Sequence, residues 1–360
     1  ARPGLIIVDE EHDLSYKQQD GLRYNARDLA VYRGHLDQVP VILGSATPSL
    51  ESLHNVQQGR YQHLRLTIRA GNAKAPSFQC LDIRSRPLEG GLSRPLTDLV
   101  SQHLGRGNQV LVFINRRGFA PTLMCHDCGW IAECRRCDAR MTVHQSPPHL
   151  HCHHCNSQRP LDRCCPKCQS EDLRPLGAGT ERTEEFLKER FADTTVLRID
   201  RESMSRKRAM QDMMTIIHSA QPCILVGTQM IAKGHDFPRV TLVGVLTADQ
   251  ALKMADFRAA ERTFQLLTQV AGRAGRGEQP GEVVIQTYYP NHYSLRHARS
   301  QDYRLFFEEE IRFRRNFQYP PFTALANCVL QGEQPRQIRD QADQLADLLL
   351  HYRTRLSSGR

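Results

Sequence analysis

The stretch QVAGRAGR, Gln269 to Arg276, places two arginines one short step apart between small residues. Small residues let a backbone come close to a phosphate chain, and the planar guanidinium of arginine stays charged and matches phosphate oxygens. Such arginines stabilise the charge that develops as a γ-phosphoryl group leaves. A solvated basic helix end would explain the octapeptide equally well, so its meaning depends on whether the chain supplies the opposite half of a nucleotide site.

An acidic cluster near the start of the chain offers that opposite half. Residues 5–8 (LIIV) are typical of a buried parallel strand, and DEEH, Asp9 to His12, follows them directly. Open α/β sheets bind ligands at the carboxyl ends of their strands. We expect Asp9 to hold Mg²⁺ through water and Glu10 to orient or deprotonate an attacking water. A solvated acidic loop is the alternative for the tetrapeptide alone.

A second short strand, residues 41–43, ends in the turn GSATPS, Gly44 to Ser49. Ser45 and Thr47 place hydroxyls in this tight turn, and a helix is expected over residues 50–57. A plain strand–turn–helix would also explain these residues. The order strand–DEEH and then strand–SAT is much harder to explain by chance than either piece.

The loop between these strands, residues 13–28, combines aromatic and basic side chains. Aromatic faces beside cations can stack on bases and grip phosphates, although surface tyrosines without such a role are equally common. The candidate DNA-binding residues of this loop are Tyr16, Lys17, Arg23, Tyr24 and Arg27.

Two later turns also follow predicted strands. GTQMIAKGHDFP, Gly227 to Pro238, fits a loop whose amides face phosphate, with Lys233 and Asp236 as candidate contacts to nucleotide or nucleic acid and Gly234 between them. The turn NRRG follows a buried strand in the same way, with Arg116 as a candidate DNA contact. Each would be a surface turn if it stood alone.

Four CxxC pairs fall within 44 residues, and each pair suits one side of a tetrahedral zinc site. A nested arrangement needs the least backbone travel, with the outer two pairs on one ion and the inner two on another. The predicted ligands are Cys125, Cys128, Cys165 and Cys168 for one Zn²⁺, and Cys134, Cys137, Cys152 and Cys155 for the other.

Other arrangements of these cysteines are less favoured. Disulfides are uncommon in a cytoplasmic chain. Cys164 and the local histidines (His126, His151, His153 and His154) are alternative ligands of lower rank, and three cysteines in apolar strands (Cys80, Cys223 and Cys328) are expected in the core.

The composition is that of a globular protein with a basic balance. The formal net charge is +9. Eight zinc-binding cysteines as thiolates would lower it by eight and two zinc ions would raise it by four, which gives +5. A polyanionic partner is therefore only moderately favoured. No apolar run is long enough to cross a membrane and no secretory pattern opens the chain, so we expect a cytoplasmic protein. Because Ala1 directly precedes a strand, we expect a piece of a longer chain.

The alternation of strands and helices predicts an α/β fold with two RecA-like lobes, the first of them partial. A zinc-ribbon-like insert interrupts the second lobe, and a small α+β domain follows it, with a helix over residues 292–317, a strand over 323–330 and a helix over 334–352. The predicted parts are residues 1–70 for the first lobe, 71–95 for the interlobe linker, 96–124 and 173–290 for the second lobe, 125–172 for the insert and 291–360 for the C-terminal part.

The ordered motifs resemble motifs II to VI of superfamily 2 helicases: DEEH, GSATPS, NRRG, GAGTE, GTQMIAKGHDFP and QVAGRAGR. The four CxxC pairs, together with DEEHDLSYKQQ and DFRAAER, resemble the bacterial primosomal replication-restart helicases, the primosomal protein N′ family. This resemblance covers nearly the whole chain. Asn25 departs from it, since the family pattern leads us to expect His there.

The resemblance implies an ATP-dependent 3′–5′ DNA helicase that acts at stalled replication forks and promotes primosome assembly. Its implied cofactors are ATP with Mg²⁺ and two Zn²⁺. Its implied partners are forked and single-stranded DNA, single-strand-binding protein and the proteins that load the replicative helicase, on the nucleoid. Implied catalytic residues are Asp9, Glu10, Arg273 and Arg276, and implied ATP-binding or coupling residues are His12, Ser45, Thr47, Gly234, Asp236 and Gln269.

One element of the family is missing from these residues. No GxxxxGK[ST] phosphate-binding loop occurs in the sequence, and in the family it lies upstream of DEEH. We therefore expect these 360 residues alone to hydrolyse no ATP. Two other functions share many of the same features: an RNA helicase or translocase of the same superfamily, and a zinc-ribbon binding module whose motor has decayed.

Overall fold

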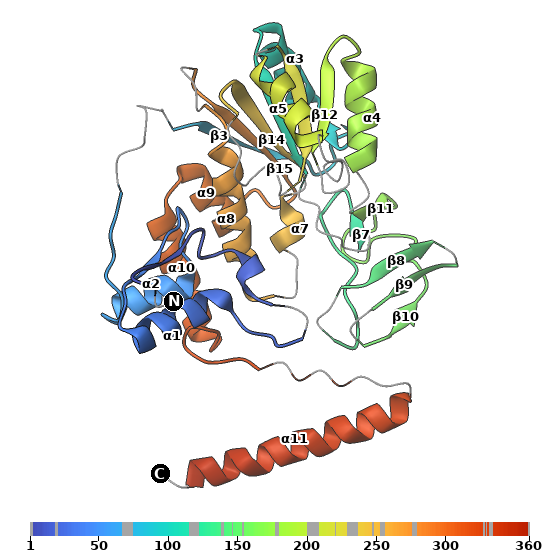
Figure 1. The fold of residues 1–360 in the computed structure, drawn as a ribbon. Coiled ribbons are helices and arrows are strands. Elements are labelled where there is room, and N and C mark those ends of the chain that lie inside the picture. The colour runs from blue at the N-terminus through green and yellow to red at the C-terminus, as the bar shows by residue number, and fades with distance from the viewer. Residues whose placement is uncertain are drawn as a thin grey trace. The chain divides into compact units, whose positions relative to one another are not determined.

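The computed structural model describes residues 3–18, 21–66, 75–114, 122–137, 140–145, 147–152, 155–176, 180–199, 209–219, 221–228, 237–246, 248–252, 256–275, 279–326, 328, 330 and 334–358. The chain forms two compact units, Ala1–Phe313 and Arg314–Arg360. The larger unit contains the predicted motor and zinc insert (Figure 1).

The larger unit contains a six-stranded parallel sheet, drawn in the upper part of Figure 1. Every residue of its three central strands is buried, as expected where helices cover both faces of a parallel sheet. In spatial order the strands are β12 (Thr195–Ile199), β13 (Cys223–Gly227), β6 (Gln109–Ile114), β14 (Val240–Leu246), β15 (Glu282–Thr287) and β3 (Ser77–Asp82).

Helices α3 (Arg94–Gly105) and α4 (Thr180–Arg190) share one apolar core with this sheet. Gly244 in β14 permits the close approach of α3, because a Cβ there would lie 3.1 Å from the Leu96 side chain. The other helices around the sheet are α5 (Ala209–His218), α7 (Asp249–Leu252), α8 (Ala259–Ala271) and α9 (Tyr293–Ser300) (Figure 1).

The predicted linker, residues 71–95, includes strand β3. This strand pairs in parallel with β15 and forms the edge of the six-stranded sheet. A small hairpin of β4 (Leu88–Glu89) and β5 (Leu92–Ser93) then leads into α3. The segment from Ser77 onward is therefore part of the second lobe rather than a connection between lobes.

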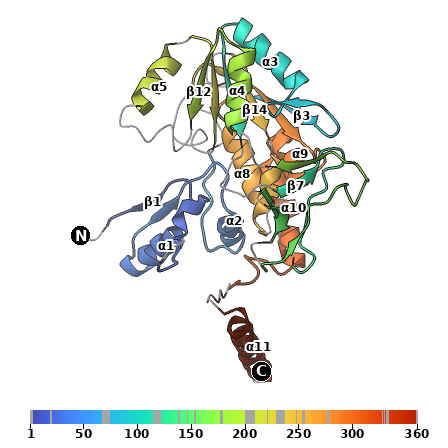
Figure 2. The same cartoon turned by 90° about the vertical axis from the view of Figure 1, so that its right-hand side faces the viewer.

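The first-lobe fragment consists of a parallel strand pair with helices beside it (Figure 2). The side chain of Asn25, the departure from the family pattern, accepts the Arg27 N–H and caps the first long helix, and Ser49 caps the next by accepting the Ser52 N–H. The elements are β1 (Ile6–Val8), η1 (Leu14–Tyr16), α1 (Ala26–Asp37), β2 (Val41–Leu43) and α2 (Leu50–Gln57).

The predicted zinc insert is a five-stranded antiparallel sheet that branches from the end of the six-stranded sheet (Figure 1). Its small core contains Met141, Val143 and Leu150 beside zinc-site cysteines. In spatial order the strands are β10 (Gln158–Arg159), β9 (Pro148–His151), β8 (Thr142–Gln145), β7 (Thr122–Cys125) and β11 (Leu173–Leu176).

Two predictions for the C-terminal part are wrong. The single helix expected over residues 292–317 is two helices, α9 and α10 (Tyr303–Asn316), because Gln301 adopts a left-handed backbone with φ of 53° and ends α9. No described residue between 323 and 330 lies in the strand expected there. The last predicted helix is confirmed and extends further, as α11 (Pro335–Ser358).

None of the helices in the described part of the chain combines the length and the apolar run that a membrane crossing requires.

The backbone at Gly275 in the QVAGRAGR stretch leaves no room for a side chain. Its φ is +69°, and a Cβ there would lie 2.4 Å from the Gly281 amide nitrogen. We expect Gly275→Ala to lower the free energy of unfolding by about 2 kcal/mol or more, because left-handed strain and a backbone clash add. Gly105→Ala is the control, since nothing lies within 4 Å of its Cβ position. Equal thermal unfolding of the two variants would contradict this.

Candidate nucleotide site and zinc centres

The DEEH stretch forms a tight turn at the carboxyl end of β1, beside the turn that follows β2. The two turns are joined where the Glu11 N–H donates to the Gly44 carbonyl at 3.0 Å. Glu10 adopts a left-handed backbone with φ of 48°, and its N–H donates to Asp9 Oδ1 at 3.0 Å. The Tyr16 hydroxyl donates to the Asp9 carbonyl at 2.6 Å. The two predicted carboxylates therefore lie in a constrained loop at the sheet edge where parallel α/β folds bind ligands.

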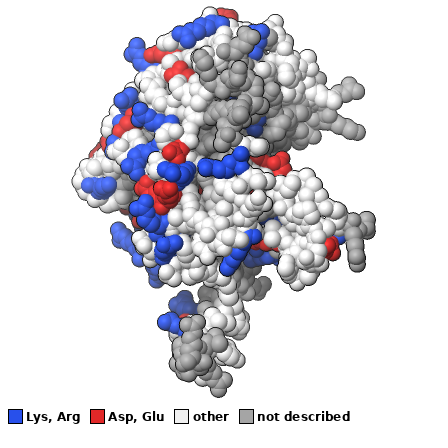
Figure 3. All heavy atoms as spheres, turned by 90° about the vertical axis from the view of Figure 1, so that its left-hand side faces the viewer, with Lys and Arg blue, Asp and Glu red and all other residues white. Residues whose placement is uncertain are grey.

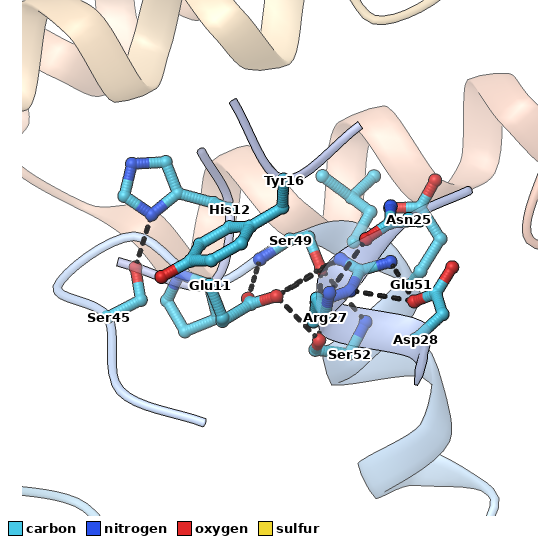
Figure 4. Close-up of polar contacts among 12 residues, drawn as sticks. Glu11, His12, Tyr16, Asn25, Arg27, Asp28, Ser45, Ser49, Glu51 and Ser52 are labelled. Carbon is cyan, nitrogen blue, oxygen red and sulfur yellow. Dashed lines mark hydrogen bonds and ion pairs between the residues drawn. The ribbon is translucent and has the colours of Figure 1, made fainter. Parts of the chain in front are cut away.

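The third acidic residue of this turn, Glu11, is the polar centre of the first-lobe fragment (Figure 4). Its side chain is 1% exposed. The carboxylate accepts the Ser49 N–H at 2.5 Å and the hydroxyls of Ser49 and Ser52 at 3.0 Å each, and it pairs with Arg27 at 3.1 Å. Glu11 thus joins the first turn, the second turn and α1 through one buried group. Its position in the acidic cluster gave no separate signal for this role.

Arg27 serves this buried network. Its guanidinium is 14% exposed and contacts Glu11, Asp28 and Ser49. Burial lowers its pKa, but the carboxylates of Asp28 and Glu11 outweigh this and raise the pKa of Arg27 overall. This geometry favours an internal role over the predicted contact with DNA, which stays a prediction.

The remaining basic and aromatic residues of the loop differ in exposure. Tyr16 is held by Asp9, and burial first, then the Asp9 charge, raises the pKa of its phenol. The Lys17 ammonium donates to the Arg23 carbonyl at 3.0 Å. Arg23 and Tyr24 are exposed at the tip of the loop, where they are accessible to a nucleic acid.

His12 connects the two lobes. Its Nδ1 lies 2.7 Å from Ser45 Oγ, and its Nε2 lies 2.7 Å from the side-chain amide nitrogen of Gln269 at the end of α8. Ser45 Oγ also accepts the Thr47 N–H at 2.9 Å. Three of the predicted coupling residues, from motifs that are 33 and 257 positions away from His12, therefore form one chain of hydrogen bonds.

Four polar residues, one directly before α8 and three within it, face the first-lobe fragment. We call this set the α8 polar stripe: Arg258, Glu261, Gln265 and Gln269. Their spacing of three or four residues puts them on one side of the helix. The Glu261 carboxylate accepts the Leu50 N–H at the start of α2 at 3.0 Å, which places a negative charge at a helix N-terminus.

The other members of the α8 polar stripe complete the interface. The Gln265 amide donates to the Thr47 carbonyl at 3.3 Å, and Arg258 pairs with Glu51 of α2 at 2.6 Å. On another side of α8 Phe264 stacks on Phe306 of α10 with ring centroids 4.3 Å apart. Arg258 and Glu261 lie in the DFRAAER motif, but of the stripe only Gln269 had a predicted role. Polar residues at helical spacing within an otherwise buried helix were a readable signal for the others.

Thr47 has an unusual hydroxyl. The residue is fully buried, and among the described residues its Oγ1 has no hydrogen-bond partner. An unsatisfied buried hydroxyl carries a desolvation cost. This group lies in the turn between the two lobes, where the family resemblance expects a coupling residue.

The predicted arginine pair is only partly described. Arg273 is half-buried, and its N–H donates to the Val270 carbonyl at 3.0 Å, one turn beyond Gln269. Arg276 lies outside the described residues, and the same holds for Arg116, Lys233, Gly234 and Asp236.

The eight CxxC cysteines form the two predicted nested clusters. In the outer cluster, the Sγ atoms of Cys125 and Cys168 lie 3.6 Å apart, and so do those of Cys128 and Cys165. In the inner cluster the corresponding distances are 3.4 Å for Cys134 and Cys155 and 3.5 Å for Cys137 and Cys152.

These distances fit zinc and exclude disulfides. Sulfurs of a tetrahedral site with Zn–S bonds of about 2.3 Å are about 3.8 Å apart, whereas a disulfide requires about 2.05 Å. The Arg136 N–H, 3.3 Å from Cys134 Sγ, lowers the pKa of that thiol to about 6. The sulfur is then a thiolate at neutral pH, the form that binds zinc.

The lower-ranked cysteine and histidine ligands lie outside both clusters. His126 contacts the Tyr288 hydroxyl at 2.9 Å and the Arg86 carbonyl at 2.6 Å, and exposed Cys164 lies near Gln169. His151 belongs to a separate histidine group, and His153 and His154 lie outside the described residues. Of the predicted core cysteines, Cys223 is buried and Cys80 half-buried, but Cys328 is exposed, so that prediction was wrong.

Acidic and basic side chains are interspersed on the face drawn in Figure 3. The net charge of +9 is therefore not gathered into one uniformly basic surface on this face.

Comparison with known proteins assigns two segments and relates nearly the whole chain to one group. The sequence model of the PriA DNA helicase Cys-rich region matches residues 134–160, and that of the helicase conserved C-terminal domain matches residues 168–278. The replication restart protein PriA of Haemophilus influenzae is 48% identical over 344 residues, which are 96% of this chain and 47% of that protein. Its namesake in Bacillus subtilis is 43% identical over 96% of this chain and 43% of that protein.

The chain therefore spans about half the length of these curated relatives. Solved structures with lower similarity include RecG bound to a three-way DNA junction, at 14% identity and a TM-score of 0.43, covering 95% of this chain and 33% of that one. Yeast Dbp5 bound to RNA and ADP BeF3 has 15% identity and a TM-score of 0.42, over 86% of this chain and 62% of that one.

The buried pair of Glu11 and Arg27 gives a direct test of the first-lobe network. We expect Glu11→Gln to lower the free energy of unfolding by roughly 3 kcal/mol, because it leaves a buried guanidinium without its buried counter-charge. Asp28→Asn is the matched control: Asp28 pairs with the same guanidinium but is 62% exposed, and exposed pairs contribute about 1 kcal/mol or less. Denaturant unfolding measures both. Equal losses would show that Glu11 is not the centre of the network.

Proposed function

Because the chain belongs to the PriA family of replication restart proteins, of which it spans about half the length, we propose that it is part of an ATP-dependent 3′–5′ DNA helicase. In this proposal the complete protein acts at stalled replication forks and promotes primosome assembly. Its activity there would place it in the cytoplasm, on nucleoid DNA.

The contact between His12 and Gln269, at 2.7 Å, carries the motor proposal. It connects the turn that bears Asp9 and Glu10 with the end of α8, directly before Arg273. Enzymes gain most of their rate in phosphoryl transfer from positioning and charge stabilisation, so carboxylates and arginines must converge from two walls of one site. The hydrogen bonds of the α8 polar stripe support that convergence.

We assign the following roles within this site. Asp9 holds the Mg²⁺ that accompanies ATP, Glu10 orients or deprotonates the attacking water, and Arg273 and Arg276 stabilise charge on the γ-phosphate. Coupling to DNA passes through His12, Ser45, Thr47 and Gln269, with Gly234 and Asp236 in the same group. The buried Thr47 hydroxyl fits this role, because a change in the lobe interface could give it a hydrogen-bond partner.

We place DNA contacts on the exposed tip around Arg23 and Tyr24, together with Tyr16, Lys17, Arg116 and Lys233. Aromatic side chains beside cations suit single-stranded DNA without sequence preference. Single-strand-binding protein and the proteins that load the replicative helicase are the proposed protein partners. Since the chain contains no GxxxxGK[ST] loop, we propose that it does not hydrolyse ATP without the rest of the protein.

Glu10→Gln in the complete protein tests the motor proposal. We expect DNA-stimulated ATP turnover to fall about 10²- to 10⁴-fold, since the variant loses a general base, while binding to forked DNA is retained. Glu89→Gln in the β4–β5 hairpin is the control for charge removal elsewhere, and its turnover should equal that of the parent protein. Wild-type turnover in Glu10→Gln would refute the proposed role.

Cys134→Ser tests the insert. The complete protein should retain one of its two cysteine-bound zinc ions by metal analysis, because a tetrahedral site that loses a thiolate binds zinc poorly. Strand separation should fall more than ATP turnover, since the affected cluster lies in the insert and not at the lobe interface. An ATP turnover that collapses while unwinding persists would give the insert a different function, and retention of both ions would refute the nested pairing.

A further inference from the structure

Three histidines on the β8–β9 hairpin of the insert belong to neither cysteine cluster. His144 of β8 pairs directly with His149 of β9 in the antiparallel register, and His151 lies two residues further along β9. Opposed residues of an antiparallel pair share a face, and so do residues two apart on one strand. The three imidazoles therefore lie on one face of the hairpin. The intervening Leu150 is fully buried in the core of the insert.

The three imidazoles are close enough for one metal ion. One nitrogen from each of His144, His149 and His151 lies within 4.8 Å of the others. Nitrogens of a tetrahedral zinc site, with Zn–N bonds of about 2.1 Å, are about 3.4 Å apart, so small rotations of partly exposed rings reach that geometry. The rings of His144 and His149 are already stacked, with centroids 4.9 Å apart.

Hydrogen bonds fix which nitrogen of two of these rings bears the proton. His149 Nδ1 lies 2.7 Å from the Pro147 carbonyl, which can only accept, so this nitrogen is the donor and Nε2 carries the lone pair. His151 Nε2 lies 2.6 Å from Asn156 Oδ1, which leaves the lone pair on Nδ1. Metal-binding histidines characteristically donate their second N–H to a carbonyl or carboxylate in this way.

We propose that His144, His149 and His151 bind a third Zn²⁺, with its fourth position open to water. Three imidazoles and no thiolate make this a weaker site than the two cysteine clusters, and imidazole ligands suit zinc. The ion would tie β8 to β9 on the face opposite the core of the insert. This site neither requires nor implies the proposed helicase activity.

Calorimetric titration of Zn²⁺ into the whole chain, already holding its two cysteine-bound ions, tests the proposal. We expect one additional equivalent in the wild type. His149→Asn should weaken this third site by at least about 10-fold, and Asn156→Gly should weaken it by about 10- to 100-fold through loss of the acceptor for His151. Glycine is chosen because the φ of Asn156 is 59°, in the left-handed region. His63→Asn, an exposed histidine outside the insert, should change nothing.

Metal analysis of each variant checks that the two cysteine-bound ions remain. If His149→Asn loses one of them, His144→Asn replaces it as the test variant. Absence of an additional equivalent in the wild type would overturn the proposal. A third site of unchanged affinity in the histidine variants that keep both cysteine-bound ions would also overturn it.

Discussion

The contact between α8 and the turn before α2 is the constraint on which the candidate site depends. In the proposed function, neither DEEH nor QVAGRAGR acts on a triphosphate alone, since phosphoryl transfer requires groups fixed on both sides of it. The α8 polar stripe supplies that fixation through backbone groups of Thr47 and Leu50 and through the side chain of His12. The carboxylate of Glu11 in turn holds the first-lobe turns together through Ser49 and Arg27, so that α8 contacts turns of fixed position.

Aromatic side chains attach the insert to the six-stranded parallel sheet. Tyr288 and Tyr289 follow β15, and their hydroxyls contact His126 Nδ1 at 2.9 Å and the Gly129 carbonyl, respectively. Both partners lie in or beside the first CxxC turn, and Gly129 has a φ of +76°. Burial raises the pKa of Tyr289 to about 12, so this phenol remains a donor at neutral pH. The outer cysteine cluster is therefore held beside the carboxyl end of β15 in the six-stranded sheet.

Local patterns predicted most of the elements, and long-range contacts account for what they missed. The CxxC spacing identified the pairs, because two intervening residues direct both sulfurs toward one ion, and the order of the pairs along the chain was sufficient to predict the nested clusters. The strands ending in DEEH and GSATPS were recognisable from their apolar runs. Glu11 could not be separated from its acidic neighbours, because its importance comes from Ser49 and Arg27, far along the chain. The place of β3 in the sheet depended in the same way on its pairing with β15, which is distant in sequence. The break between α9 and α10 depended on the left-handed backbone conformation of the single residue Gln301.

A double-mutant cycle on His12 and Gln269, measured as DNA-stimulated ATP turnover of the complete protein, tests the central claim most directly. If the lobes act through this hydrogen bond, His12→Ala and Gln269→Ala should each reduce turnover. The turnover of the double variant should then be nearly equal to that of the less active single variant. The corresponding coupling energy is about 1 kcal/mol or more. Strictly additive effects would show that the two residues act independently, and would contradict a motor site assembled by α8.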